Sequence, residues 1–171
     1  MSEQRLTPRI TSTARALWSI YFVLTVLCIF AYRLAGMSYF DAVSHAFSTV
    51  SIGGFSTHDL SIGFFDSLSI EIVCITFMLL SAMSFAVHYS AIYRKQVLKY
   101  FYDPELRFFI SLLIAILGLV CLSLFANHID DPIRSGLFQT VSILTTTGFL
   151  TDEYSSWPAY ISFMLLVGAF V

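Results

Sequence analysis

Two short segments of the chain combine glycine with hydroxyl side chains and carry no charge. Residues 51–56 read SIGGFS, and residues 145–150 read TTTGFL. Glycine permits backbone conformations that aim carbonyl oxygens to one side, and rings of such oxygens can replace the hydration shell of a potassium ion. The segments therefore predict a cation site built from backbone oxygen. The expected ligand residues are Ser51, Ile52, Gly53, Gly54 and Phe55 in the first segment, and Thr145, Thr146, Thr147, Gly148 and Phe149 in the second.

Four side chains of these segments have further expected roles. Thr146 and Thr147 could add hydroxyl oxygen to the carbonyl ligands. Phe55 and Phe149 each follow a glycine, and we expect them to wedge the segments against the surrounding helices. No charged side chain lies within either segment to compete with the oxygen ligands.

The residues just beyond each segment are charged or titratable. His58 and Asp59 follow the first segment, and Asp152 and Glu153 follow the second. Acids at the outer mouth of a pore would raise the local concentration of cations. A solvated loop accounts for the same residues, so both interpretations stay open.

A short apolar stretch precedes each segment, at residues 39–50 and 132–144. About 12 helical residues rise only ~18 Å, which reaches about halfway through a bilayer. The stretches therefore predict re-entrant half-helices, whose C-terminal ends carry partial negative charge and favour a cation. Their starts agree, because Ser38 opens a capping box and Asp131 would be an N-cap before a proline.

The two halves of the chain repeat one pattern. An offset of 94 residues places Gly54 on Gly148, and the phenylalanine after each glycine also coincides. Caps, half-helix lengths and the Gly-Phe pair have separate physical causes, so their agreement indicates an internal duplication. We expect a first repeat at residues 1–100 and a second at residues 101–171.

The composition predicts that both repeats lie in a membrane. Of the 171 residues, 57% are hydrophobic and 12% are charged, and the mean hydropathy is +0.80. Four apolar stretches predict helical spans, which cross a bilayer in about 20 residues. The last stretch stops at Val171 without a polar flank, so we expect it to be truncated. The spans are expected at about residues 16–36, 69–93, 106–127 and 158–171. The predicted fold is an all-α, potassium-channel-like membrane protein with two tandem helix–pore loop–helix repeats.

Basic residues indicate which ends of the spans face the cytoplasm. Arg15 and other arginines precede the first span, and Arg94, Lys95, Lys99 and Arg107 lie between the second and third. Because cytoplasmic loops are enriched in Lys and Arg, these ends are predicted to be cytoplasmic and the pore loops to open outward.

Other classes of function find little support in the sequence. The net charge of -2 and the lack of a basic run interleaved with aromatics exclude a nucleic-acid partner. Cys28, Cys74 and Cys121 lie in separate apolar runs, so we expect inert thiols and no cofactor beyond a transported cation. An intramembrane enzyme would need ionisable catalytic groups inside its spans. His45 is interpreted as a hydrogen-bonded packing residue, and the chain is predicted not to be an enzyme.

Four stretches of the sequence follow the pattern of a known family. They are residues 47–59 (FSTVSIGGFSTHD), 84–89 (SFAVHY), 103–107 (DPELR) and 145–149 (TTTGF). They resemble the Trk/Ktr/HKT potassium transporters, and specifically the bacterial Trk membrane subunit, over nearly the whole chain. In that family four repeats surround one pore, and each contributes a filter segment with a central glycine, which Gly54 and Gly148 match.

The resemblance implies potassium uptake by a multi-pass protein embedded in the lipid of the bacterial cytoplasmic (inner) membrane. It also implies a homodimer and a cytosolic, nucleotide-binding Trk regulatory subunit. This chain departs from the pattern by holding only two pore loops, which we interpret as the second and third. The missing repeats are therefore expected partners. The alternative is that the chain is a structural fragment that does not conduct ions. An unrelated membrane protein or an enzyme fits the sequence less well.

Overall fold

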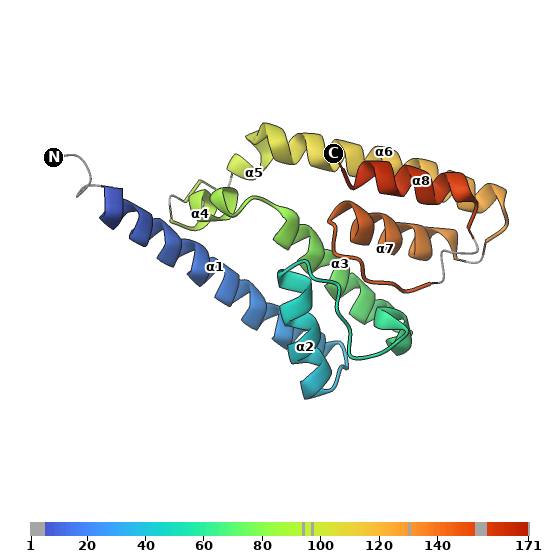
Figure 1. Cartoon of the computed structure of the whole chain (residues 1–171), viewed down its shortest axis with the longest axis horizontal. Coiled ribbons are helices and arrows are strands. Elements are labelled where there is room, and N and C mark those ends of the chain that lie inside the picture. The colour runs from blue at the N-terminus through green and yellow to red at the C-terminus, as the bar shows by residue number, and fades with distance from the viewer. Residues whose placement is uncertain (1–5, 94, 97, 130, 153–156, 171) are drawn as a thin grey trace.

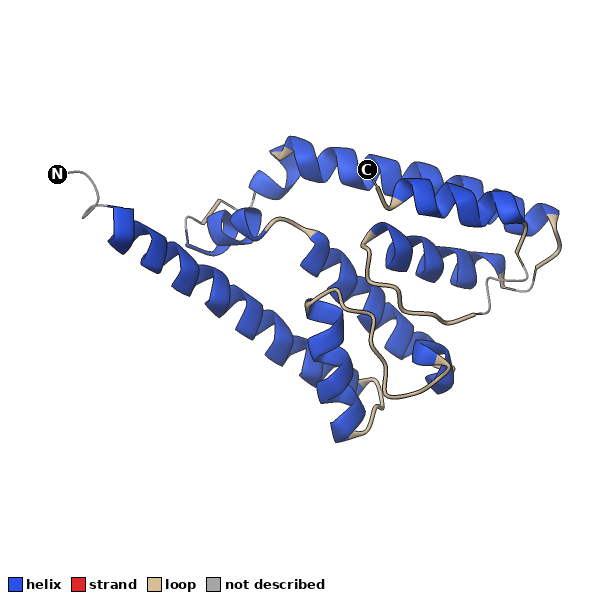
Figure 2. Cartoon of the chain, in the orientation of Figure 1, coloured by secondary structure: helices blue, strands red, loops and turns tan. Residues whose placement is uncertain are grey.

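The described part of the chain is helical throughout. The computed structural model describes residues 6–93, 95–96, 98–129, 131–152 and 157–170. Within these ranges Figures 1 and 2 show helices and loops without a strand, which confirms the all-α fold class. The elements are α1 (Leu6–Leu34), α2 (Tyr39–Val50), the 3-10 helix η2 (Ser61–Phe65), α3 (Leu68–Ala82), α4 (Phe85–Tyr93), α5 (Lys99–Tyr102), α6 (Pro104–Ala126), α7 (Pro132–Leu144) and α8 (Ala159–Gly168).

Two straight helices among the described residues are long and apolar enough to cross a membrane. They are Thr13–Leu34, within α1, and Pro104–Ala126, which is α6. Their outer faces are apolar, since Phe22 on α1 is 67% exposed and Leu122 on α6 is 68% exposed. Apolar faces of this size need lipid or further helices around them.

The second predicted span, residues 69–93, is not one straight helix. Met83 ends α3 with an extended backbone (φ -70°, ψ 143°), and α3 and α4 lie at 94° to each other. The break leaves the last carbonyls of α3 without helical donors. The His88 ring lies 2.8 Å from one of them, the Leu80 oxygen, through Nε2. The predicted span at residues 69–93 therefore consists of two helices that meet at a sharp angle, as in a broken span or a re-entrant loop, and apolar composition does not reveal such a break.

The half-helices α2 and α7 occupy the ranges predicted for them. α2 packs against α1 and α3, whereas α7 packs against α3, α6 and α8. Figure 1 shows α3 running between the two groups of helices. α3 therefore contacts both half-helices and brings the loops after them together.

An ion-pair cluster joins the N-terminal ends of α3 and α7. The Arg134 guanidinium donates to Glu71 through Nε at 3.0 Å and through Nη2 at 2.7 Å, and also to Asp66 at 3.0 Å. The Glu71 side chain is 3% exposed, so this pair is largely desolvated. Its hydrogen bonds raise the pKa of Arg134 above the usual range. Glu71 thus links the two halves of the chain.

Candidate functional site

Both candidate segments leave their half-helices in the same way. The backbone N–H groups of the first three residues after each helix turn back to the carbonyls of its last turn. This pattern tightens the end of the helix and satisfies carbonyls that would lack partners. In the first copy the bonds are Ser51 to Phe47 (3.0 Å), Ile52 to Thr49 (3.1 Å) and Gly53 to Ser48 (2.8 Å). In the second they are Thr145 to Val141 (2.9 Å), Thr146 to Ile143 (2.9 Å) and Thr147 to Ser142 (2.9 Å).

The backbone dihedrals repeat as well. Ile52 and Gly54 have φ values of 56° and 67°, and the residues 94 positions later, Thr146 and Gly148, have φ values of 58° and 86°. Left-handed backbone is costly for a β-branched residue such as Ile52 or Thr146. Such strain persists where the surrounding structure imposes it, commonly at functional sites. The same unusual backbone conformation therefore occurs in both segments.

The two segments touch each other. A Cβ atom on Gly54 would overlap with the carbonyl oxygen of Thr147, so only glycine fits at position 54. Further along, the Gly63 N–H donates to the Leu150 carbonyl at 3.0 Å, and the Leu150 N–H donates to Ser61 Oγ at 3.1 Å. The loop after the second segment is thereby fastened to η2 of the first repeat.

The side chains of the segments differ between the copies. Phe149 is fully buried, as a wedge against the helices requires, whereas Phe55 is 80% exposed within this chain, so its wedge role stays a prediction. Thr147 is 3% exposed, and its hydroxyl bonds to that of Thr145 at 2.8 Å. Thr146 is exposed. Local sequence could not separate the two phenylalanines, because their burial depends on the opposite repeat.

Asp41 contacts the residues that follow the first segment. It accepts a hydrogen bond from Thr57 at 2.7 Å, and His58 Nε2 lies 3.1 Å from the same carboxylate oxygen. Hydrogen bonds from Ser38 and Thr57 lower the pKa of Asp41 below its ordinary value. The His58 ring also stacks on Phe64, with 3.7 Å between centroids. Asp41 thus ties the start of α2 to the loop that follows the first segment.

The acids predicted at the outer mouth take different positions. Asp59 is exposed. Asp152 accepts a hydrogen bond from Ser135 Oγ at 3.1 Å. Glu153 lies outside the described residues. Whether these acids concentrate cations stays a prediction.

The predicted helix caps also differ in outcome. Ser38 caps α2, because its hydroxyl accepts a hydrogen bond from the Asp41 N–H at 3.1 Å. Asp131 does occupy the N-cap of α7, with Pro132 at the first helical position, but its side chain makes no capping bond. Its φ of 44° is left-handed, whereas a capping side chain normally accompanies extended backbone.

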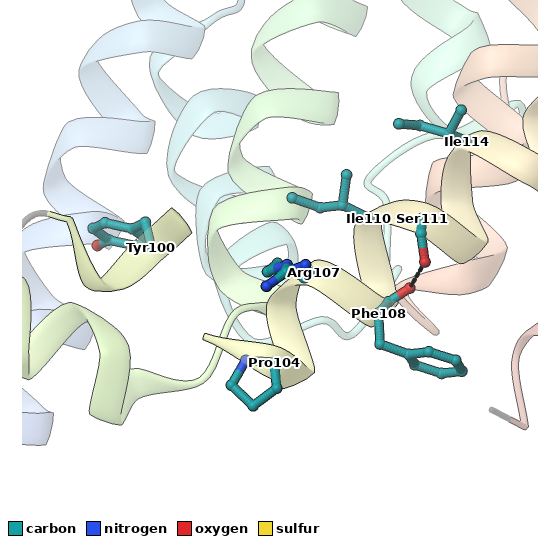
Figure 3. Close-up of a pocket in the computed structure, with 7 residues that line it drawn as sticks. All are labelled: Tyr100, Pro104, Arg107, Phe108, Ile110, Ser111 and Ile114. Carbon is teal, nitrogen blue, oxygen red and sulfur yellow. Dashed lines mark hydrogen bonds between the residues drawn. The ribbon is translucent and has the colours of Figure 1, made fainter. Parts of the chain in front are cut away.

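A separate pocket lies next to α5 and the start of α6 (Figure 3). Its volume is about 670 Å³, and its lining residues are Tyr100, Pro104, Arg107, Phe108, Ile110, Ser111 and Ile114. Arg107 is the one charged residue in that lining, and the Ser111 hydroxyl donates to the Phe108 carbonyl at 2.8 Å. The lining holds no acid–base pair of the kind that catalysis needs. In the described part of the chain, no group of three or more His, Cys, Asp or Glu residues could hold a metal ion.

Two contacts near the segments were not predicted from the sequence. The Arg134–Glu71 pair joins the two halves of the chain, and within the second half the fully buried Gln139 donates to the Asp152 carbonyl at 3.2 Å. The 94-residue offset was an available signal for Gln139, since it places this residue on His45.

Comparison with known protein families identifies the family of this chain. The family described as "TrkH: Cation transport protein" matches residues 1–171. The chain belongs to the TrkH family. Membership agrees with the family resemblance of the two candidate segments, and it places this TrkH-family chain among membrane-embedded transport proteins.

The relatives of this chain include potassium uptake proteins. The TrkH-family chain is 48% identical to the Trk system potassium uptake protein TrkH of Halomonas elongata and 39% identical to the one of Escherichia coli. In both cases all of this chain aligns, with 36% of the relative. The crystal structure of the potassium transporter TrkH from Vibrio parahaemolyticus matches with a TM-score of 0.90 and 45% identity, covering 95% of this chain and 36% of that chain. The chain thus spans about a third of the length of these relatives.

Proposed function

We propose that this chain supplies two filter segments of a Trk-type potassium uptake protein. Residues 51–55 and 145–149 would bind potassium through their backbone carbonyls. The observation that carries the proposal is the repeated left-handed backbone at Gly54 and Gly148, in two segments that touch. The named relatives are potassium uptake proteins, which supplies the identity of the ion.

Helix electrostatics favour a cation at this position. α2 and α7 both end immediately before the segments, and neither has a basic residue in its last turn. The C-terminal end of a helix carries partial negative charge, so two such ends stabilise a cation. Non-helical backbone at membrane depth is tolerated where it lines a pathway for water or ions.

The two glycines face different surroundings. Gly54 meets the second segment, whereas a Cβ atom on Gly148 would find no other atom within 4 Å. In a ring of similar segments, each glycine would face the carbonyls of the next one. The open side of Gly148 therefore suits a further segment from the rest of the complete protein, which in the relatives is about three times as long as this chain.

For the complete protein we also propose a multi-pass location in the bacterial cytoplasmic membrane, a homodimer and a cytosolic nucleotide-binding regulatory subunit. These rest on the family resemblance and on the name "Trk system" that the relatives carry. We propose transport and not catalysis. A second candidate, a structural fragment that does not conduct by itself, is favoured for the isolated chain by the open side of Gly148.

The test uses the complete transporter with Gly54→Ser, Gly148→Ser and the control Gly118→Ser. Gly118 lies in α6, where a Cβ atom meets nothing within 4 Å and φ is not left-handed, so it controls for the substitution itself. Potassium and sodium uptake are measured in cells. We expect both filter variants to lose preference for potassium and Gly118→Ser to keep it. Wild-type selectivity in both filter variants would contradict the filter assignment.

A further inference from the structure

His45 lies behind both candidate filter segments. Its side chain belongs to α2 and is fully buried. Nδ1 lies 2.8 Å from the Asp41 carbonyl of its own helix, and Nε2 lies 2.9 Å from Oγ of Ser56, the last residue of the first segment. The ring also packs at 6.0 Å between centroids from Phe149 of the second segment. One side chain therefore contacts the exits of both segments.

The partners of His45 define its hydrogen bonds. A carbonyl only accepts, so Nδ1 carries the proton that it donates to Asp41, and Nε2 of the neutral ring accepts from the Ser56 hydroxyl. Ser56 Oγ also accepts a hydrogen bond from the backbone N–H of His58 at 3.1 Å. The bonds run in one direction from His58 through Ser56 and His45 to Asp41, and both ring nitrogens of His45 have a partner. A side chain without polar atoms could not replace this arrangement.

Gln139 occupies the equivalent position in the second repeat. It lies 94 residues after His45, it is also fully buried, and its Nε2 donates to the Asp152 carbonyl at 3.2 Å. Asp152 lies in the loop after the second segment, and Ser56 is the last residue of the first. The two repeats thus use different side chains at one position of the half-helix, each making a hydrogen bond to the chain near the end of its segment.

We propose that His45 and Gln139 are positioning residues that hold the exits of the two filter segments against their half-helices and thereby determine potassium selectivity. The proposal rests on the assignment of these segments as a potassium filter. Its physical basis is that backbone carbonyls replace the hydration shell of the ion, and a side chain that holds the segment keeps those carbonyls directed at the ion. We call each of these two side chains, with its hydrogen bond, a brace. Each brace restrains its segment at the C-terminal end, whereas the half-helix holds the N-terminal end.

The test compares apolar, conservative and partner variants in the complete transporter. His45→Leu removes the polar contacts, His45→Gln introduces the residue used by the other repeat, and Ser56→Ala removes the partner alone. We expect His45→Leu and Ser56→Ala to lower potassium-to-sodium selectivity about three- to tenfold, which is the equivalent of one net hydrogen bond. His45→Gln should stay within about twofold of wild type, because its amide can accept from Ser56.

Two further variants complete the design. Gln139→Met keeps the length of the side chain and removes its donor, so it should lower selectivity as His45→Leu does. Thr25→Val is the control for a lost buried hydrogen bond away from the filter, since the Thr25 hydroxyl donates to the Tyr21 carbonyl within α1. Thr25→Val should leave selectivity unchanged.

The outcomes separate the brace from the filter itself. If Gly54→Ser alters selectivity but His45→Leu and Ser56→Ala do not, the brace is wrong and the filter stands. If Gly54→Ser also has no effect, the filter assignment has failed. Equal damage from His45→Leu and His45→Gln, with no effect of Ser56→Ala, would show that His45 only fills space. If His45→Leu fails to fold, the selectivities of Ser56→Ala and Gln139→Met decide.

Discussion

The carbonyl group of Thr147 lies against the α-carbon of Gly54, so closely that a side chain at position 54 would overlap with it. The two residues belong to different repeats. Glycine is necessary at position 54 for two reasons. Its φ of 67° is left-handed, and the neighbouring segment leaves no room for a Cβ atom. Gly148 has only the first reason, because the space beside it is open.

Alanine at these two glycines should therefore have unequal effects on the isolated chain. Gly148→Ala should lower the free energy of unfolding by about 1–2 kcal/mol, the cost of left-handed backbone for a residue with a Cβ atom. Gly54→Ala should cost at least about 1 kcal/mol more, because it must also displace Thr147. Reversible unfolding in detergent measures both. Equal losses would show that the Gly54–Thr147 contact is absent.

Removing Arg134 should destabilise the chain, because it leaves the carboxylate of Glu71 buried without a counter-charge. We expect Arg134→Ala to cost about 3 kcal/mol, at the lower end for a broken buried pair, since the Arg134 side chain is 35% exposed. The exposed Asp59→Asn is the control and should stay within about 0.5 kcal/mol. Glu71→Gln in the Arg134→Ala background should recover part of the loss, whereas additive losses would argue against the pair.

The stabilisation from Asp41 should depend on pH in a defined direction. Hydrogen bonds from Ser38 and Thr57 lower the pKa of Asp41, so its stabilisation is fully present above the unfolded pKa of about 4 and is lost as the pH falls through the folded pKa. Asp41→Asn should melt at a lower temperature than wild type at pH 7, and this difference should shrink only below about pH 4. A difference that disappears between pH 5 and 7 would point to another group. Circular dichroism melts at several pH values measure it.

The sidedness of the loops can be tested with single cysteines in the complete protein. After removal of the native cysteines, Asp152→Cys should react with an impermeant maleimide in intact cells, because the pore loops are predicted to open outward. Lys95→Cys should react only after permeabilisation, since it lies in the basic loop expected in the cytoplasm. Strong labelling at position 95 in intact cells would reverse the orientation.

The 171-residue chain expressed alone should not support potassium uptake. Two segments leave a dehydrated cation without enough oxygen ligands, and an unsatisfied polar group already costs several kcal/mol away from water. Rubidium influx is measured in cells without other potassium-uptake systems, with the complete transporter as the positive control. Saturable influx through the short chain would show that two segments suffice, for example by pairing of two copies.

The half-helices could be predicted from the sequence because their causes are local. Ser38 begins α2 with a side-chain cap, and the apolar residues of each stretch continue for the length that the structure shows. The glycines of both segments were recognisable too, since left-handed backbone favours glycine wherever it occurs. The 94-residue offset linked the two copies without any knowledge of their contacts.

Other features depend on residues that are distant in the chain. At the break after α3 the His88 ring contacts the Leu80 carbonyl, and Phe149, unlike Phe55, is buried with its ring near His45 of the opposite repeat. Composition and spacing by themselves determined that this is a helical membrane protein with two glycine-centred loops, because hydropathy and caps act within single segments. Only the tertiary structure placed Gly54 against Thr147, because packing on the shared helix α3 brings the two loops together.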